Sequence, residues 1–376
     1  MKKNIYTLCL CFTILVTKSM VAQCPIPTSI TSLNGNAMTA VLPHGGDFFW
    51  DGSDAGYGLN SNDPVFPDVR TIFAGGLWMG GFSPSSDLRV AATEYGMGFG
   101  DTDYFAGPIN DDGSTDCNNW DRHWRIAKSE IDEFLIDWSD GTLDSPIPPN
   151  VKGWPGRGNP HFMELFGFDF PNLFYQFAPF HDENSNGIYD PEGGDYPDVK
   201  GADHAVYWVY NDAGGLHTET GGEPLGAEVH ALAYAFSSAD EAINQTTFYN
   251  LRTIYKGSEP LTDSYLSLWI DADLGCYTDD FIGCNPDQEM AYVYNQDATD
   301  GSSGCNCPGG VATFCEEIPV VGIKMLEGVT AGRVINADGE LEVPGPGVTP
   351  EVFVDVGMTN FAYYNNGGET PPPPPG

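Results

Sequence analysis

The sequence predicts a mostly β fold, with sandwich-like antiparallel sheets, long loops and one or two short helices. The 376 residues include 46 glycines and 29 prolines, and many of them gather in clusters typical of turns. Short runs rich in aromatic and β-branched residues lie between these clusters, as expected for strands. Hydrophobic residues make up 41% of the chain and aromatic residues 13%, which is enough for a large core.

Eight segments have the composition and length of strands. They lie between turn clusters and together favour packed antiparallel sheets. The candidate strands are residues 71–79, 88–95, 204–210, 228–236, 246–255, 264–270, 290–294 and 320–325.

One segment, residues 129–138, predicts a helix. Ser129 can cap its first turn, with Asp132 three residues further on. Apolar side chains recur at helical spacing on one face, which indicates core packing; they are Ile131, Phe134, Leu135 and Trp138.

The N-terminus predicts export. Lys2 and Lys3 precede an apolar run at residues 5–16, and small residues suited to cleavage follow at residues 20–22. Residues 1–22 are therefore interpreted as a secretory signal peptide. No later stretch reaches 18 apolar residues, so we expect no transmembrane segment and a secreted, extracellular or outer-surface location.

The chain is strongly acidic. The signal segment holds three of the 15 Lys and Arg residues and none of the 53 Asp and Glu residues, so the exported chain would carry 12 basic and 53 acidic side chains. Such a chain repels nucleic acid and anionic membrane surfaces and attracts cations. We therefore expect no nucleic-acid partner. Solubility in salty or calcium-rich surroundings also accounts for the charge.

Two β-rich regions are predicted, at residues 23–150 and 151–365. The best internal break is the Gly- and Pro-rich segment 153–160, which could equally be a structured loop. Residues 366–376 combine glycines with a proline run, which is typical of a linker or of the place where a longer chain is cut.

Cysteine usage favours disulfides. Seven cysteines remain after the signal segment, and five of them lie between residues 276 and 315. Zinc is the alternative for Cys305 and Cys307, although neither a CxxC motif nor a histidine partner accompanies them. The odd count leaves Cys24 free, acylated as in a bacterial lipobox, or paired elsewhere; Gln23 disfavours the lipobox.

Residues 181–198, HDENSNGIYDPEGGDYPD, predict a calcium-binding loop. Oxygen ligands fall at positions 1, 3, 5 and 9, with Gly187 at the turn position and a backbone carbonyl at position 7. Position 12 is Gly193, so Glu192 or Asp195 must replace the usual bidentate glutamate. A solvated turn is the alternative interpretation. The candidate ligands are Asp182, Asn184, Asn186, Ile188 (carbonyl), Asp190 and Asp195.

A second acidic cluster is predicted at the end of candidate strand 264–270. Asp271 and Asp273 leave the strand, and Asp279 and Asp280 follow closely. Four convergent carboxylates repel one another unless a cation or shared protons neutralise them. A second structural Ca²⁺ is therefore a hypothesis here, against a solvated loop.

Five motifs occur together and in order: IFAGGLWMGG (72–81), WPGRGN (154–159), APFHDENSNGIYDPEGGDYP (178–197), NQTTFYNLRTIYKGS (244–258) and DADLGCYTDDFIGCN (271–285). Over nearly all of residues 40–366 the chain resembles the large secreted or cell-surface proteins of Bacteroidetes-type bacteria that carry a type IX secretion sorting domain. The resemblance implies surface exposure or secretion. It also implies that this chain is an N-terminal part without the sorting domain, and it supplies no reaction.

No catalytic constellation is recognised. The spacing of His204, His217 and His230 does not form the HExxH geometry. Glu219, Glu223 and Glu228 lie near one another and are expected on the surface. The sequence therefore favours a calcium-stabilised structural or adhesion module that meets an extracellular protein or glycan partner. The alternative is a glycan-binding or polysaccharide-acting module, with Trp50, Trp78, Trp154 and Trp208 as nominal stacking residues, each more expected in the core.

Overall fold

The computed structural model describes residues 23–52, 56–59, 69–301, 305, 313–335, 341–342 and 352–364. The predicted signal peptide and the segment 366–376 lie outside these residues. None of the described helices has both the length and the hydropathy that crossing a bilayer requires.

The structure is mostly β, as predicted, and its paired strands are antiparallel apart from one isolated parallel bridge. The strands are β1 (Ile30–Leu33), β2 (Met38–Pro43), β3 (Asp47–Phe48), β4 (Tyr57–Leu59), β5 (Arg70–Ile72), β6 (Ala74–Phe82), β7 (Leu88–Ala91), β8 (Phe105–Ala106), β9 (Trp124–Ala127), β10 (Phe180–His181), β11 (Tyr196–Pro197), β12 (His204–Asn211), β13 (Ala227–Ala235), β14 (Thr247–Tyr255), β15 (Thr262–Asp271), β16 (Asp280–Asn285), β17 (Met290–Asn295), β18 (Val321–Lys324), β19 (Thr330–Ile335), β20 (Leu341–Glu342) and β21 (Val352–Asp355).

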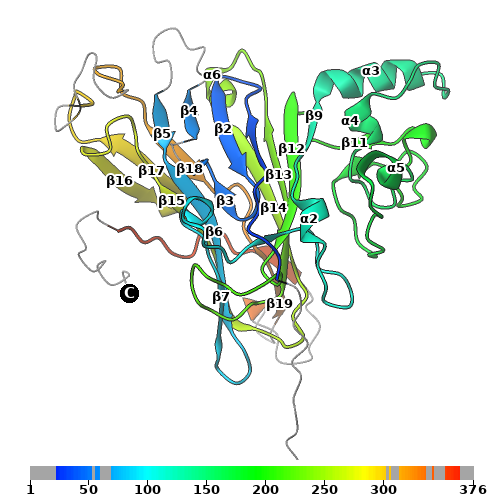
Figure 1. Ribbon diagram of the computed structural model, residues 1–376. Coiled ribbons are helices and arrows are strands. Elements are labelled where there is room, and N and C mark those ends of the chain that lie inside the picture. The colour runs from blue at the N-terminus through cyan, green and yellow to red at the C-terminus, as the bar shows by residue number, and fades with distance from the viewer. Residues whose placement is uncertain are drawn as a thin grey trace, which may run out of the picture.

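Short helices lie in the loops between the strands (Figure 1). They are α1 (Gly96–Phe99), α2 (Cys117–Trp120), α3 (Lys128–Trp138), α4 (Pro149–Lys152), α5 (Phe162–Phe166) and α6 (Glu241–Asn244). These exceed the one or two that were predicted, because most are single turns that leave no periodic pattern in the sequence.

Helix α3 is the predicted helix, and its apolar face packs as expected. Ile131 and Phe134 are buried in the core. The predicted cap is wrong, because Ser129 lies inside the first turn. The carboxylate of Glu130 instead accepts the backbone N–H of Ala127 at 3.1 Å, which satisfies a donor at the helix start.

The largest sheet, here called the central sheet, has the order β14-β13-β12-β8, with β9 also paired to β12. Alternate residues of β12 enter two different cores: Val206 and Trp208 face one, and Tyr207 and Val209 face the other. Burial on both faces explains why this strand is a continuous apolar run and does not alternate with polar residues.

Helices cover one face of the central sheet, and other sheets cover the opposite face. On the first face α3, α4 and α5 pack over β9 and β12 (Figure 1). On the second, the core is shared with the sheet β1-β2-β4-β5 and with the β6 sheet, which consists of β15-β6-β3 with β7 paired to β6. The small sheets together are closer to a four-bladed propeller than to a clear sandwich.

The two predicted regions share their sheets. β8 and β9, which precede residue 150, pair with β12, and β6 pairs with β15. The segment 153–160 is a structured loop: Trp154 is fully buried, and the Asn159 side-chain amide donates to the carbonyl oxygens of Lys152 and Trp154.

Candidate functional site

The predicted calcium loop is closed at its base by two short strands. β10 ends at His181 and pairs with β11, which begins at Tyr196. Asp182 directly follows β10, and Asp195 directly precedes β11. The two residues therefore lie side by side at the end of this β ladder, although they are 13 positions apart. This closure could not be inferred from the loop spacing alone.

The loop turns back on itself as the spacing requires. Gly187 has a φ of 75°, in the left-handed region that favours glycine. Its N–H donates to Asp182 Oδ2 at 2.6 Å, and the N–H of Ile188 donates to Asn186 Oδ1 at 2.7 Å. Each of these oxygens has a further lone pair, so these contacts are compatible with metal ligation.

Asp195 supplies a buried carboxylate beside the loop. Its Oδ1 accepts the N–H of Glu183 at 2.9 Å, and its Oδ2 accepts the N–H of Asp190 at 2.8 Å. Burial raises the pKa of Asp195, and the charges of Asp182 and Asp190 raise it further. The charges of Asp182 and Asp190 thus oppose ionisation of Asp195, and a hard cation beside it would relieve that repulsion.

Of the two replacements considered for the position-12 glutamate, the geometry favours Asp195. Glu192 turns away and contacts His161 at 2.6 Å between Oε1 and Nε2. Ca²⁺ in this loop would therefore be held by the candidate ligands named from the sequence, with Asp195 as the additional carboxylate.

The WPGRGN segment supports this loop. Arg157 Nη1 donates to the carbonyl oxygen of Gly187 at 3.1 Å, and Gln176 Nε2 donates to the same oxygen at 3.0 Å. Tyr189 is fully buried, and its hydroxyl donates to the carbonyl oxygen of Val151 at 2.5 Å. Two motifs that the sequence shows separately thus form one structural unit.

The second acidic cluster joins the end of β15 to the start of β16. Burial, and then the charge of Asp271, raise the pKa of Asp273 to about 6. Burial raises the pKa of Asp280 to about 7, with further contributions from Asp273, Asp279 and Asp300. Asp271 itself accepts the hydroxyl of Tyr95 at 2.6 Å. The predicted carboxylates are therefore close enough to influence one another.

Asp300 joins this cluster and was missed in the sequence. It is fully buried, and its oxygens accept the N–H groups of Cys276 (2.9 Å) and Phe314 (2.5 Å). It lies 20 residues beyond Asp280, with two strands between them, so only the tertiary fold brings it near. The NQDATDG segment around it is the only signal that the sequence offers.

The ligand atoms of Cys276, Asp279 and Asp300 lie within 4.8 Å of one another. Cys276 is disulfide-bonded to Cys305, so its sulfur is not a thiolate ligand. The remaining donors are carboxylate oxygens, which suit Ca²⁺ better than zinc.

The disulfides decide between the alternatives for Cys24. Cys24 pairs with Cys117, so it is neither free nor the unpaired member of the set. Cys284 is the free thiol among the described residues. Cys315 is also disulfide-bonded, and Cys307 lies outside the described residues.

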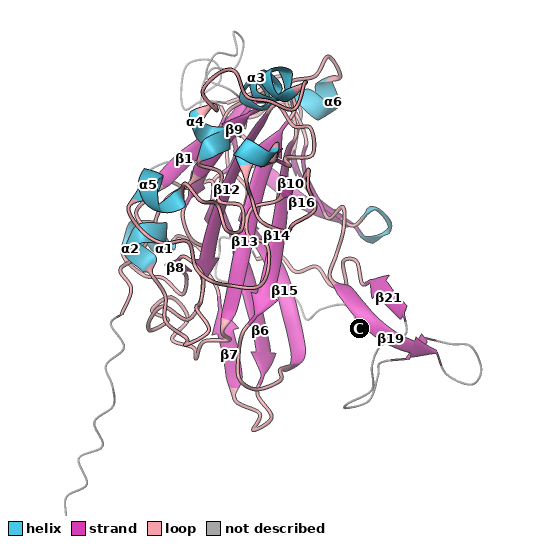
Figure 2. Cartoon of the chain, turned by 90° about the vertical axis from the view of Figure 1, so that its right-hand side faces the viewer, coloured by secondary structure: helices cyan, strands magenta, loops and turns pink. Residues whose placement is uncertain are grey.

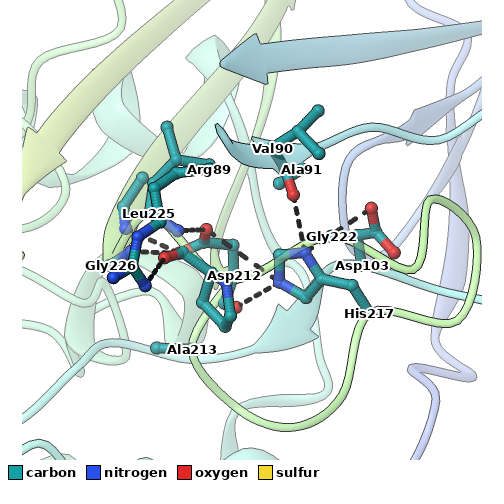
Figure 3. Close-up of polar contacts among 12 residues, drawn as sticks. Arg89, Val90, Ala91, Asp103, Asp212, Ala213, His217, Gly222, Leu225 and Gly226 are labelled. Atoms are coloured by element: carbon teal, nitrogen blue, oxygen red, sulfur yellow. Dashed lines mark hydrogen bonds and ion pairs between the residues drawn. The ribbon is translucent and has the colours of Figure 1, made fainter. Parts of the chain in front are cut away.

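A buried ionic cluster closes the loop between β12 and β13 (Figure 3). His217 Nδ1 lies 2.7 Å from the carbonyl oxygen of Val90, and Nε2 lies 2.7 Å from that of Asp212. Carbonyl oxygens only accept, so the ring nitrogens are placed to donate to these two backbone groups. The Asp103 and Asp212 carboxylates flank the ring at 3.6 and 4.0 Å.

Asp212 also holds the start of β13. Its carboxylate accepts the N–H groups of Leu225, Gly226 and Ala227, at 2.5 to 2.9 Å. Figure 3 shows this carboxylate between those amides and the His217 ring. The cluster therefore stabilises both ends of the long loop between β12 and β13, which is a structural role.

The expectation that Glu228 lies on the surface is wrong. Glu228 is fully buried, and its oxygens accept from Tyr175 (2.7 Å), His230 (2.6 Å) and the N–H of Ile109 (2.7 Å). Burial opposes its ionisation, but the hydrogen bond and charge of His230 lower its pKa overall. Its partners come from distant segments, which is why sequence composition misplaced it.

The tryptophans divide into two groups. Trp154 and Trp208 are fully buried and Trp50 nearly so, as expected for core residues. Trp78 is partly exposed and stacks on Trp269, which the sequence did not single out.

Comparison of the chain with protein-family models, curated proteins and solved structures found no match. The resemblance to type IX-secreted proteins therefore remains a prediction from the motifs.

Proposed function

We propose that this chain is a calcium-stabilised, β-rich structural or adhesion module of a secreted or cell-surface protein. The observation that carries the proposal is the buried carboxylate of Asp195 beside a glycine-turned loop, where the charges of Asp182 and Asp190 raise its pKa. A bound Ca²⁺ would neutralise these carboxylates and fix the loop, and the same logic extends to the cluster around Asp280. The metal is a structural brace in this proposal.

The disulfide bonds are consistent with the proposed secretion. Disulfides such as Cys24–Cys117 and Cys276–Cys305 form and persist in oxidising compartments. The predicted signal peptide and the motif resemblance point in the same direction, toward export by the type IX route.

The proposed scaffold is sandwich-like at its centre, where the central sheet faces two smaller sheets across one core. Long braced loops around that core would present a stable surface to an extracellular protein or glycan. The excess of acidic side chains argues against nucleic acid and anionic membranes as partners.

The proposal is tested by calcium titration of the full chain and of two matched variants. Asp195→Asn removes a buried candidate ligand, whereas Glu192→Gln alters a half-exposed neighbour that contacts His161. We expect Asp195→Asn to weaken calcium binding by roughly 10-fold or more and Glu192→Gln to leave it unchanged. Circular dichroism in EDTA establishes that both variants are folded. If both variants bind calcium with equal affinity, the loop that contains Asp195 is not a calcium site and the proposal fails there.

A glycan-binding function is the second candidate. The parallel pair Trp78 and Trp269 on the β6 sheet specifically favours it.

A further inference from the structure

We propose that the outer face of the β6 sheet binds a neutral glycan whose equatorially linked sugar rings stack on Trp78 and Trp269. This site is independent of the proposed calcium loop. Figure 2 shows β7, β6 and β15 side by side at one end of the molecule.

Strand register places the two indoles on one face. In the β6–β15 ladder Trp78 is opposite Ser267, and Trp269 is opposite Gly76. Directly opposed residues point to the same side of a sheet, and so do residues two apart along a strand. The ring centroids are 6.2 Å apart, and the ring planes differ by only 6°. The two rings are therefore adjacent and nearly parallel, and together they form one aromatic patch.

The surface is held in place before any ligand arrives. Trp78 Nε1 donates to the carbonyl oxygen of Thr93 at 2.8 Å. Tyr95 meets Trp269 edge-on, with centroids 5.1 Å apart, and its hydroxyl is fixed by Asp271. A platform fixed in this way loses little conformational entropy when it binds.

On β6 the opposite face packs into the core, whereas on β15 the same face leaves Leu266 and Leu268 exposed. Leu77, Met79 and Ile270, which alternate with the outer residues, contribute to the core shared with the central sheet. Outward on β15, Tyr265 is 67% exposed and lies four residues, about 13 Å, from Trp269 on the same side. Phe82 and Leu88 continue the exposed apolar strip across β6 and β7.

The chemistry of this strip favours sugar. Flat aromatic rings stack on the C–H faces of pyranoses, and equatorial linkages keep successive rings in one plane. The hydroxyl of Ser267 and the carboxylates of Asp271 and Glu94 lie on or beside the strip, and sugar hydroxyls can donate to such oxygens. The formal charge of −38 disfavours anionic polysaccharides, so the ligand is a neutral glycan.

The test titrates the full chain with cellohexaose, chitohexaose and mannohexaose by calorimetry. Variants Trp78→Ala and Trp269→Ala remove the platform. Phe174→Ala is the matched control, because this ring is 83% exposed but lies in the loop after α5. We expect at least one glycan to bind, with roughly 10-fold weaker binding in each tryptophan variant and no change in the control. Near-native melting temperatures identify folded variants.

Two results would overturn the proposal. One is the absence of binding to all three glycans, and the other is binding that both tryptophan variants retain. Sedimentation of the free protein adds a third, because a dimer abolished by Trp269→Ala would assign the face to a second copy of the chain. Calcium binding is scored separately in the Asp195→Asn titration, so failure of one proposal is distinguishable from failure of the other.

Discussion

At the scale of single residues, the most consequential groups are carboxylates that the fold buries together. Asp280 is partly buried, and Asp273, Asp279 and Asp300 all act on it. Its pKa of about 7 lies above the ordinary value of 3.8, so the folded state holds a proton that the unfolded chain releases. Its favourable contribution is complete at low pH and is lost as pH rises through 7.

Replacing this carboxylate by an amide should therefore have opposite effects with and without calcium. In EDTA at pH 8, Asp280→Asn should stabilise the protein by about 1–2 kcal/mol, after allowance for partial exposure. At pH 5 that gain should be smaller, because the folded carboxyl is then protonated and only the unfolded chain ionises. The gain should disappear only below the ordinary pKa of 3.8. In calcium the variant should gain less stability than the wild type, because it has lost a ligand.

Urea unfolding under these three conditions measures the effects, with exposed Asp287→Asn as the control. A destabilised Asp280→Asn in EDTA at pH 8 would contradict the repulsion on which the second calcium hypothesis rests.

Residue-level burial was the least predictable property. Glu228 is acidic and lies in a glutamate-containing segment, so the sequence favoured the surface. Its burial depends on Tyr175 and on Lys256, which directly follows the neighbouring strand β14 and whose Nζ lies 3.5 Å from Glu228 Oε2. Asp300 was missed for the same reason, since its partners come from separate loops.

At the scale of elements, the longest strands were predicted, whereas many shorter ones, such as β2 and β16, were not. β14, expected at 246–255, is Thr247–Tyr255, and β12, expected at 204–210, is His204–Asn211. Composition and flanking turns carry that information locally. The polar first strand β1 (Ile30–Leu33) left no such signal. Pairing of β6 with β15 joins segments almost 200 positions apart and is determined only by tertiary packing.

The segment around Thr93 lies against β6 and explains why the GGLWMGG strand has a glycine at position 76. A Cβ on Gly76 would lie 2.3 Å from the carbonyl oxygen of Thr93, the same atom that accepts from Trp78. At Gly80 the nearest atom to such a Cβ is 3.6 Å away, an ordinary contact. The two positions lie on the same face of the same strand and form a matched pair.

We therefore expect Gly76→Ala to destabilise the protein by about 1–3 kcal/mol, since backbone must shift. Gly80→Ala should be neutral or stabilising by up to about 1 kcal/mol, through a less flexible unfolded chain. Thermal melts compare the two variants, and tryptophan fluorescence reports movement of Trp78. Equal melting temperatures would show that the segment at Thr93 does not press on β6 as described.

At the scale of the whole molecule, our proposal of bound calcium connects the acidic composition to the fold. The chain has 53 acidic and 15 basic side chains, and the fold gathers several carboxylates at two loop clusters. The glycine turn of the candidate calcium loop was predictable from the sequence, and calcium binding itself stays a prediction. The closing strands β10 and β11 and the supporting Arg157 were not, because both depend on distant segments.

The most direct test of the central claim is a pair of thermal melts of the full chain, one in saturating Ca²⁺ and one in EDTA, with Mg²⁺ as the control. A ligand that binds only the folded state stabilises it by about 2.7 kcal/mol at 100 times its Kd. We predict a higher melting temperature in Ca²⁺ than in EDTA or Mg²⁺, with calcium retained by the purified protein on metal analysis. Identical melting temperatures and no retained calcium would contradict the account.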